Sequence, residues 1–229
     1  MRFKRIITGL AAAGLLGLTP LAVSAPANAD GQTYTPNIAF DISPAQSLYT
    51  YGDDFYVSGS VTGPTAVDTP SGGQAQLQIY TPANPVWTTI ATDDSPGFLY
   101  FPGPWTFTSN TQLKVVYTGF TAPNEFYDTY LPGESAPLAV PVTYKLNAKT
   151  PGTSIVGKIK PSYAKKKVII QRKVGKSYKK YRSVRTNKKS QFRVKLPTGA
   201  RGKKVFFRVI IKGSSEMTGL AAGFYTIRY

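Results

Sequence analysis

Residues 205–213 read VFFRVIIKG, a stretch in which one face is wholly apolar and the other also carries Arg208 and Lys212. Every second residue from Val205 to Ile211 is apolar and falls on one side of an extended chain, because successive side chains of a strand point to opposite faces. The last seven residues of this stretch, FRVIIKG at 207–213, match LKVVYTG at 113–119, ninety-four residues earlier. The alternation predicts strands, and the repetition predicts two copies of one β-domain.

Three further stretches repeat in the same order along the chain. They are QAQLQIYT (74–81) with KKVIIQRK (166–173), WTTIAT (87–92) with YKKYRSVRT (178–186), and FLYF (98–101) with FRVKL (192–196). Gly and Pro, 39 of 229 residues, separate these short apolar stretches in turn-like positions. Short strands at such spacing, without any amphipathic helix, predict an all-β protein of two antiparallel sandwiches.

This order of features resembles the immunoglobulin-like or fibronectin-III-like repeats of secreted actinobacterial proteins. The first copy carries Tyr51-Gly52, Val57-SGSV, Ile79, Trp87, Phe98 and Tyr117-TG, and the second carries Ile155-VGKIKP, Val168-IIQR, Tyr178, Phe192 and Phe207-RVIIKG. The resemblance implies two tandem Ig-like domains that act as spacers, stalks or adhesive and wall-binding modules, without catalysis. It also places Trp87, and Tyr178 as its counterpart, in the cores of the two domains.

The amino terminus has the pattern of a cleaved signal peptide over residues 1–29. Three cations, Arg2, Lys4 and Arg5, precede an apolar stretch at 6–18, which is too short for a stable membrane anchor. Ala27-Asn28-Ala29 then supplies the small residues of a cleavage site. We expect an exported protein that is not integral to the membrane, either secreted or held non-covalently at the cell surface.

The charge changes sign near residue 144. Residues 30–144 hold ten acids and one base, a net charge of −9, whereas residues 145–229 hold twenty-four bases and one acid, a net charge of +23. Such asymmetry supports a domain boundary. We therefore predict an acidic Ig-like sandwich at 30–144, a linker at 145–152 and a basic Ig-like sandwich at 153–229.

The composition excludes several chemistries. The chain has no His and no Cys, which removes Ser-His-Asp triads, imidazole and thiolate metal sites, and disulfides. No pair of acids is placed as a glycosidase pair would be, and we predict a protein that is not an enzyme and needs no cofactor. Two features stay open. Loop acids could bind calcium or merely solvate their loops (Asp53, Asp54, Asp93 and Asp94), and Trp105 could contact a glycan or pack internally.

The most basic tract, residues 164–189, has twelve Lys or Arg in 26 positions and no acid. An ordinary solvated face mixes both signs, so this imbalance points to an anionic partner. The predicted contacts are Lys165, Lys166, Lys167, Arg172, Lys173, Lys176, Lys179, Lys180, Arg182, Arg185, Lys188, Lys189, Arg193, Lys195 and Arg208.

We expect the partner of these cations to be an anionic polymer of the cell envelope, teichoic-acid-like or another phosphate-bearing glycan, or else an acidic protein. Nucleic acid is a second candidate, which the absence of any nucleic-acid-binding motif disfavours. The cations could also be neutralised by the acidic first domain, or could form a basic face that only confers solubility. The protein could instead be a carbohydrate-binding or spacer module centred on Trp105.

Overall fold

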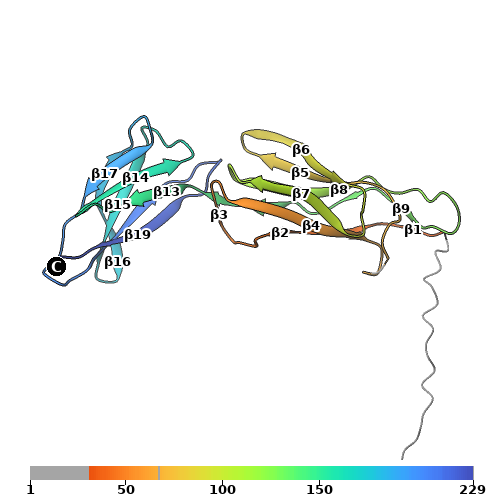
Figure 1. The fold of residues 1–229 in the computed structure, drawn as a ribbon, viewed down its shortest axis with the longest axis horizontal. Helices are drawn as coiled ribbons and strands as arrows, with labels where there is room; N and C mark the ends of the chain where they lie inside the picture. Colours follow the sequence, from red (N-terminus) through yellow and green to blue (C-terminus); the bar gives the residue numbers. More distant parts are fainter. Residues whose placement is uncertain (1–30, 67, 229) are drawn as a thin grey trace, which may run out of the picture.

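The computed structural model describes residues 31–66 and 68–228, which form strands and connecting loops (Figure 1). The strands sort into two successive sandwiches, each made of a three-stranded sheet and a larger sheet. The prediction of an all-β fold with two tandem Ig-like sandwiches is confirmed. Within the described ranges no helix is long and apolar enough to cross a membrane. The predicted signal peptide, 1–29, lies outside them.

The first sandwich has a smaller sheet in the order β2-β4-β7 and a larger sheet in the order β10-β8-β5-β6, with β11 also paired to β8. All pairs in these two sheets are antiparallel, whereas two short pairs, β1 with β9 and β3 with β12, are parallel. The strands are β1 Thr33–Tyr34, β2 Asn37–Ser43, β3 Tyr49–Thr50, β4 Asp54–Thr62, β5 Ala75–Thr81, β6 Asn84–Asp93, β7 Leu99–Thr106, β8 Thr111–Tyr117, β9 Thr129–Tyr130, β10 Gly133–Glu134, β11 Leu138–Val140 and β12 Val142–Thr143.

The second sandwich has sheets in the orders β13-β14-β17 and β16-β15-β18-β19, with antiparallel neighbours throughout. The strands are β13 Lys145–Lys149, β14 Ser154–Lys160, β15 Lys167–Val174, β16 Ser177–Arg185, β17 Gln191–Lys195, β18 Val205–Ile211 and β19 Leu220–Thr226. The four stretches that repeat in the sequence occupy the same places in both sandwiches, because β5, β6, β7 and β8 correspond to β15, β16, β17 and β18.

The segment predicted to link the domains is a linker only in part. Its first five residues, Lys145–Lys149, form β13, which pairs with β14 from Lys145 opposite Lys160 to Lys149 opposite Val156. The prediction missed this strand because polar residues outnumber apolar ones in it. Leu146 and Ala148 nevertheless alternate with the polar residues and pack against the core.

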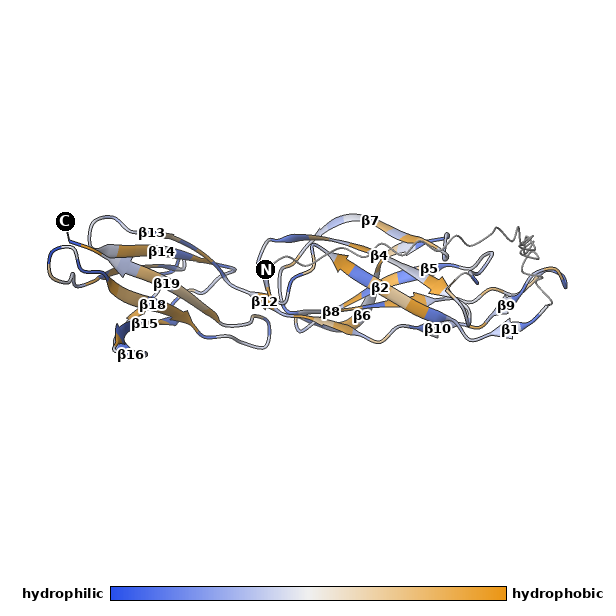
Figure 2. Cartoon of the chain, turned by 90° about the horizontal axis from the view of Figure 1, so that it is seen from below, coloured by the Kyte–Doolittle hydropathy of each residue, from blue (hydrophilic) through white to orange (hydrophobic). Residues whose placement is uncertain are grey.

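The core of each sandwich is lined by alternate residues of the strands. In β8 the side chains from Thr111 to Tyr117 are buried at every second position, and in β18 Phe207 and Val209 are fully buried. Aromatic rings fill part of the first core, where Phe55 and Phe107 stack with ring centroids 4.0 Å apart. Hydrophobic and hydrophilic bands alternate along β2 in Figure 2. One side of each strand therefore faces the core and the other faces solvent.

The two sandwiches lie end to end (Figure 1) and are joined by hydrogen bonds around Asn110. The backbone N–H of Asn110 donates to Glu216 O at 2.7 Å, and its side-chain amide donates to Ser215 O at 3.1 Å. Its side-chain oxygen accepts from Val142 N at 2.9 Å and from the Thr218 hydroxyl at 3.0 Å. These contacts between the domains use backbone groups and uncharged side chains.

Tyr117 gives the first prediction. Its hydroxyl donates to Gly72 O at 2.5 Å, and burial raises its pKa to about 12. Because the folded pKa lies above the ordinary value of about 10, the stability that this group contributes is complete below pH 10 and is lost as the pH rises towards 12. Tyr117→Phe should lower the free energy of unfolding by about 1 kcal/mol at pH 7.

Urea denaturation at pH 7 and at pH 11 tests this expectation. Tyr56→Phe, at an exposed tyrosine of β4, is the matched control and should change nothing. The hydroxyl is irrelevant to stability if both variants unfold at the wild-type urea concentration.

Candidate polyanion-binding surface

The fifteen predicted cations are all exposed or partly exposed, and Arg208 is half-buried. They do not form a single patch, because strand pairing distributes them over four regions of the second sandwich. One group lies in and beside the loops 161–166 and 186–190, a second follows the β15–β16 hairpin, and Arg193 and Lys195 lie on the outer side of β17. Arg208 lies on the outer side of β18, across the sandwich from β17.

The lysines in the first group project from loops that are held firmly. The Tyr163 N–H donates to Ser190 Oγ at 2.8 Å, and the Thr186 hydroxyl donates to the Tyr163 carbonyl oxygen, so the two loops are tied together. The Arg185 guanidinium donates to Lys165 O at 3.2 Å. The loop backbones are thus fixed by buried hydrogen bonds, while the cations remain accessible.

The outer face of the three-stranded sheet carries more cations than we predicted. On β14 and β17 the inward residues are buried, so the alternate residues face solvent. Lys158 lies opposite Gln191, and Lys195 lies opposite Ser154. Sequence reasoning missed four exposed cations of β13 and β14 because they precede the densest tract. They are Lys145, Lys149, Lys158 and Lys160.

The outer face of the four-stranded sheet combines cations with aromatic rings. The Arg208 guanidinium carbon lies 4.1 Å from the centroid of the Tyr178 ring. Lys173 Nζ lies 5.7 Å from the Phe206 ring centroid, and Lys204 Nζ lies 4.8 Å from the Tyr225 ring centroid. These distances are within the range of cation–π attraction. Sequence reasoning found Lys173 and Arg208 but missed Phe206, Tyr225 and Lys204.

The prediction that Trp87 and Tyr178 are core residues is wrong. Both rings are half-buried and rest on the outer faces of their sheets, where Trp87 is 4.8 Å from Lys114 Nζ and Tyr178 is stacked with Arg208. They belong to β6 and β16, which are the edge strands of the larger sheets. The pairing of both edge strands shifts register within the strand, so simple alternation along the sequence does not give the face of these rings.

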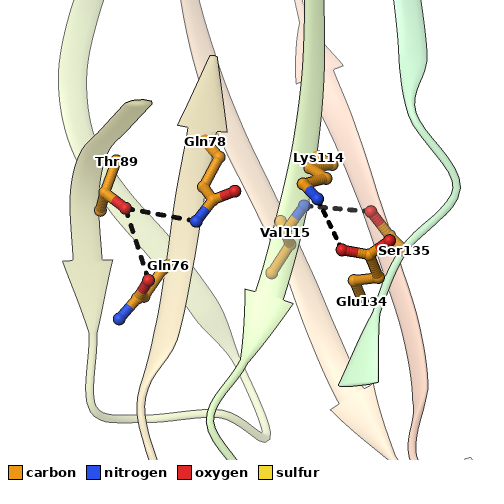
Figure 3. A network of polar contacts seen from close by, with 7 residues as sticks. All are labelled: Gln76, Gln78, Thr89, Lys114, Val115, Glu134 and Ser135. Carbon is orange, nitrogen blue, oxygen red and sulfur yellow. Dashed lines mark hydrogen bonds and ion pairs between the residues drawn. The ribbon is translucent and has the colours of Figure 1, made fainter. Parts of the chain in front are cut away.

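The equivalent face of the first sandwich is neutralised internally. Lys114 Nζ, beside Trp87, pairs with Glu134 Oε2 at 2.5 Å (Figure 3). On the same sheet the Gln78 amide donates to the Thr89 hydroxyl at 3.4 Å, and that hydroxyl donates to Gln76 Oε1 at 3.4 Å. These polar groups satisfy one another, and Lys114, the one base in residues 30–144, has its counter-charge.

Lys114–Glu134 is the single ion pair among residues 31–66 and 68–228. No described carboxylate therefore pairs with a cation of the second sandwich. Its own acid, Glu216, lies in the β18–β19 loop, where its backbone oxygen contacts Asn110. The contacts between the domains are uncharged, so contact with the acidic first domain does not neutralise the second through ion pairs.

Trp105, the candidate glycan contact, is half-buried in β7. Its ring centroid lies 5.8 Å from that of the buried Phe55, and it packs against the core of the first sandwich. Internal packing thus explains why part of the Trp105 ring is buried. Glycan binding by the exposed part stays a prediction.

The four candidate aspartates each accept a hydrogen bond from another residue. Asp53 accepts from Thr50 N at 2.8 Å, Asp54 from the Thr106 hydroxyl at 2.7 Å, and Asp94 from the Gln74 amide at 3.0 Å. In the described ranges, no group of three or more acidic side chains is arranged to hold a metal ion. Asp53 and Asp93 act here as caps of turns, whereas Asp54 and Asp94 bond to side chains that are distant in the sequence.

Asp93 is the strongest of these caps and gives the second prediction. Its two oxygens accept from Ser95 N at 2.8 Å and from Tyr100 N at 2.7 Å. Asp93→Ala should lower the free energy of unfolding by about 1–2 kcal/mol because both N–H groups lose their acceptor. Asp94→Ala, which removes a bond between side chains, is the control and should cost less.

Thermal denaturation with and without a calcium chelator checks both points. We expect the melting temperature of the wild type to be independent of calcium. A melting temperature that falls on chelation, and does not fall further in Asp93→Ala, would contradict the capping role and favour a calcium site.

Two surface hollows of the second sandwich have no Asp or Glu among their lining residues. One, of about 410 Å³, is lined by Thr153, Leu196 and Phe224 among others, and the second, of about 450 Å³, by Arg185, Asn187 and Phe192 among others. Neither is lined by a carboxylate. They offer no acid–base pair.

No family model and no curated protein matches the chain. Among solved structures, the chicken interferon gamma receptor alpha chain is similar with 8% identity and a TM-score of 0.40, covering 85% of this chain and 98% of that one. A two-domain fibronectin type III segment of chicken tenascin is similar with 14% identity and a TM-score of 0.38, covering 83% of this chain and 99% of that one.

Proposed function

We propose that this is a secreted, non-enzymatic adhesion protein whose basic second domain binds an anionic polymer of the cell envelope. The polymer is a teichoic-acid-like chain or another phosphate-bearing glycan. The acidic first domain acts as a spacer or faces a different partner. The signal-peptide pattern of the amino terminus supports export, and the resemblance to repeats of secreted actinobacterial proteins supports a role at the envelope.

One observation carries this proposal. The second domain holds twenty-four cations and one acid, and in the described residues none of these cations is in an ion pair. Charge of one sign on so small a domain repels itself, which disfavours the compact state. A ligand that supplies many negative charges removes this repulsion, and the complex is stabilised as a result.

The distribution of the cations favours a long ligand over a compact one. They occupy the outer faces of both sheets and the loops 161–166 and 186–190. A small anion would meet only one of these regions, whereas a polymer with regularly spaced phosphates can contact several at once. Release of counterions from both partners then drives binding, as it does for nucleic acids.

Nucleic acid remains the second candidate because of a specific observation. Tyr178, Phe206 and Tyr225 lie on one sheet face together with cations, and proteins that bind single strands combine stacking rings with positive charge in this way. The two candidates differ in the role of the rings, which is essential for stacked bases and secondary for phosphates.

Retention on purified cell walls tests the proposed function. The protein without residues 1–29 should bind walls that carry teichoic acid, should be released as the salt concentration rises, and should not bind walls from which the polymer has been chemically stripped. Wild-type binding to stripped walls that resists high salt would contradict the proposal and would favour a glycan site such as Trp105. Trp105→Ala is then the informative variant.

A further inference from the structure

Four outward side chains form a row across the larger sheet of the second sandwich. Tyr178 on β16 is the register partner of Lys173 on β15, and Phe206 on β18 is the partner of Tyr225 on β19. Lys173 Nζ lies over the Phe206 ring and joins the two pairs. The row therefore crosses four strands, which at about 4.8 Å between neighbours spans roughly 14 Å.

Rings and cations hold one another along this row. Arg208 stacks on Tyr178 and Lys204 lies over Tyr225, so each of the three rings has a cation within 5.7 Å of its centroid. Phe206 and Tyr225 are 43% and 54% exposed, and their ring centroids are 6.3 Å apart. Attraction to the rings limits the freedom of the three cations before any ligand arrives, which lowers the entropy cost of binding.

On the equivalent face of the first sandwich, a carboxylate neutralises the cation. Lys114 corresponds to Arg208 in the repeat, and Glu134, which neutralises Lys114, lies opposite Val116. The residue that corresponds to Val116 is Ile210, and its partner on β19 is Ala221. The second sandwich thus has a methyl group where the first has a carboxylate.

The rings of β18 and β19 have no counterpart in the first sandwich, where Tyr80 and Trp87 pair on β5 and β6. The pair that corresponds to Phe206 and Tyr225 is Gln112 and Ala139 in the first sandwich. No acid lies on the outward positions of β15, β16, β18 and β19, and Glu216 is in the loop at the opposite end of β18 from Phe206. The face of the second sandwich therefore has no carboxylate to repel an anion and has additional rings that hold cations.

We propose that this row is the track along which the second domain binds a phosphate-bearing polyol chain, with Lys173, Lys204 and Arg208 contacting successive phosphates. The inference rests on the proposed function and assigns its main site. A chain without bases suits this track because a cation already lies over each of the three rings, which leaves less ring surface for a base to stack on. The rings act as supports that fix the cations in position.

A single substitution tests the track by adding the neutralising carboxylate that the first domain has on this face. Ala221→Glu places a carboxylate in the relation to Arg208 that Glu134 has to Lys114, and Ala221→Gln is the uncharged control of equal size. With poly(glycerol phosphate) as the probe at low salt, Ala221→Glu should bind at least about fivefold more weakly than wild type, the factor that one charge contributes near an anionic surface. Ala221→Gln should bind like the wild type.

Two charge-matched triple variants separate the position of the charge from its amount. Lys173→Gln, Lys204→Gln and Arg208→Gln together remove three cations from the track. Lys158→Gln, Arg193→Gln and Lys195→Gln together remove three cations from the opposite face. The track variant should lose roughly 100-fold in affinity, about a factor of five for each cation, and the control variant much less. Circular dichroism and a thermal melt confirm that each variant is folded.

The outcomes distinguish failure of the track from failure of the proposed function. If wild type binds teichoic-acid-bearing walls but not poly(glycerol phosphate) at low salt, the track for a polyol chain is overturned and the proposed function stands. If it binds neither, both are overturned. If wild type binds but the two triple variants weaken equally and Ala221→Glu matches Ala221→Gln, the track is overturned and the proposed function stands. If single-stranded DNA of equal charge binds more tightly than the polymer, and Phe206→Leu with Tyr225→Leu abolishes that preference, the site binds nucleic acid and the polyol ligand is wrong.

Discussion

Unbalanced positive charge on the second sandwich is the constraint on which the interpretation of this protein depends. Twenty-four cations share a small domain with one carboxylate, and no ion pair among the described residues offsets them. The Ig-like fold tolerates this because strands alternate, so that residues such as Phe207 and Val209 fill the core while their neighbours carry charge outward. Different residues of the same strands therefore pack the core and carry the surface charge, and an external anion can be the counter-charge.

The two sandwiches share one architecture but differ in charge on the outer face of the larger sheet. In the first sandwich Lys114 is held between Trp87 and Glu134, and neighbouring amides and hydroxyls bond to one another. In the second, Arg208 retains its ring partner, Tyr178, and faces no acid among the described residues. The uncharged junction around Asn110 joins the copies without cancelling the charge of either. The cation on this face is thus neutralised in the first domain and has no counter-charge among the described residues in the second.

Alternation and internal repetition were enough to predict the strands of the four repeated stretches, the sandwich class and the equivalence of β8 with β18, because each depends on local sequence. The faces of Trp87 and Tyr178 were not predictable, since a register shift within an edge strand changes which way a ring points. The row that joins Tyr178, Lys173, Phe206 and Tyr225 was hidden for a related reason. It is created by register between strands that lie far apart in the sequence.

The salt dependence of binding measures the central claim most directly. For the protein without residues 1–29 and poly(glycerol phosphate), we expect the logarithm of the binding constant to fall linearly with the logarithm of the salt concentration. The slope should be about −2 or steeper, because each of three phosphate contacts contributes about −0.7. A slope near zero, with binding that persists at high salt, would contradict the view that unbalanced charge draws this domain to its ligand.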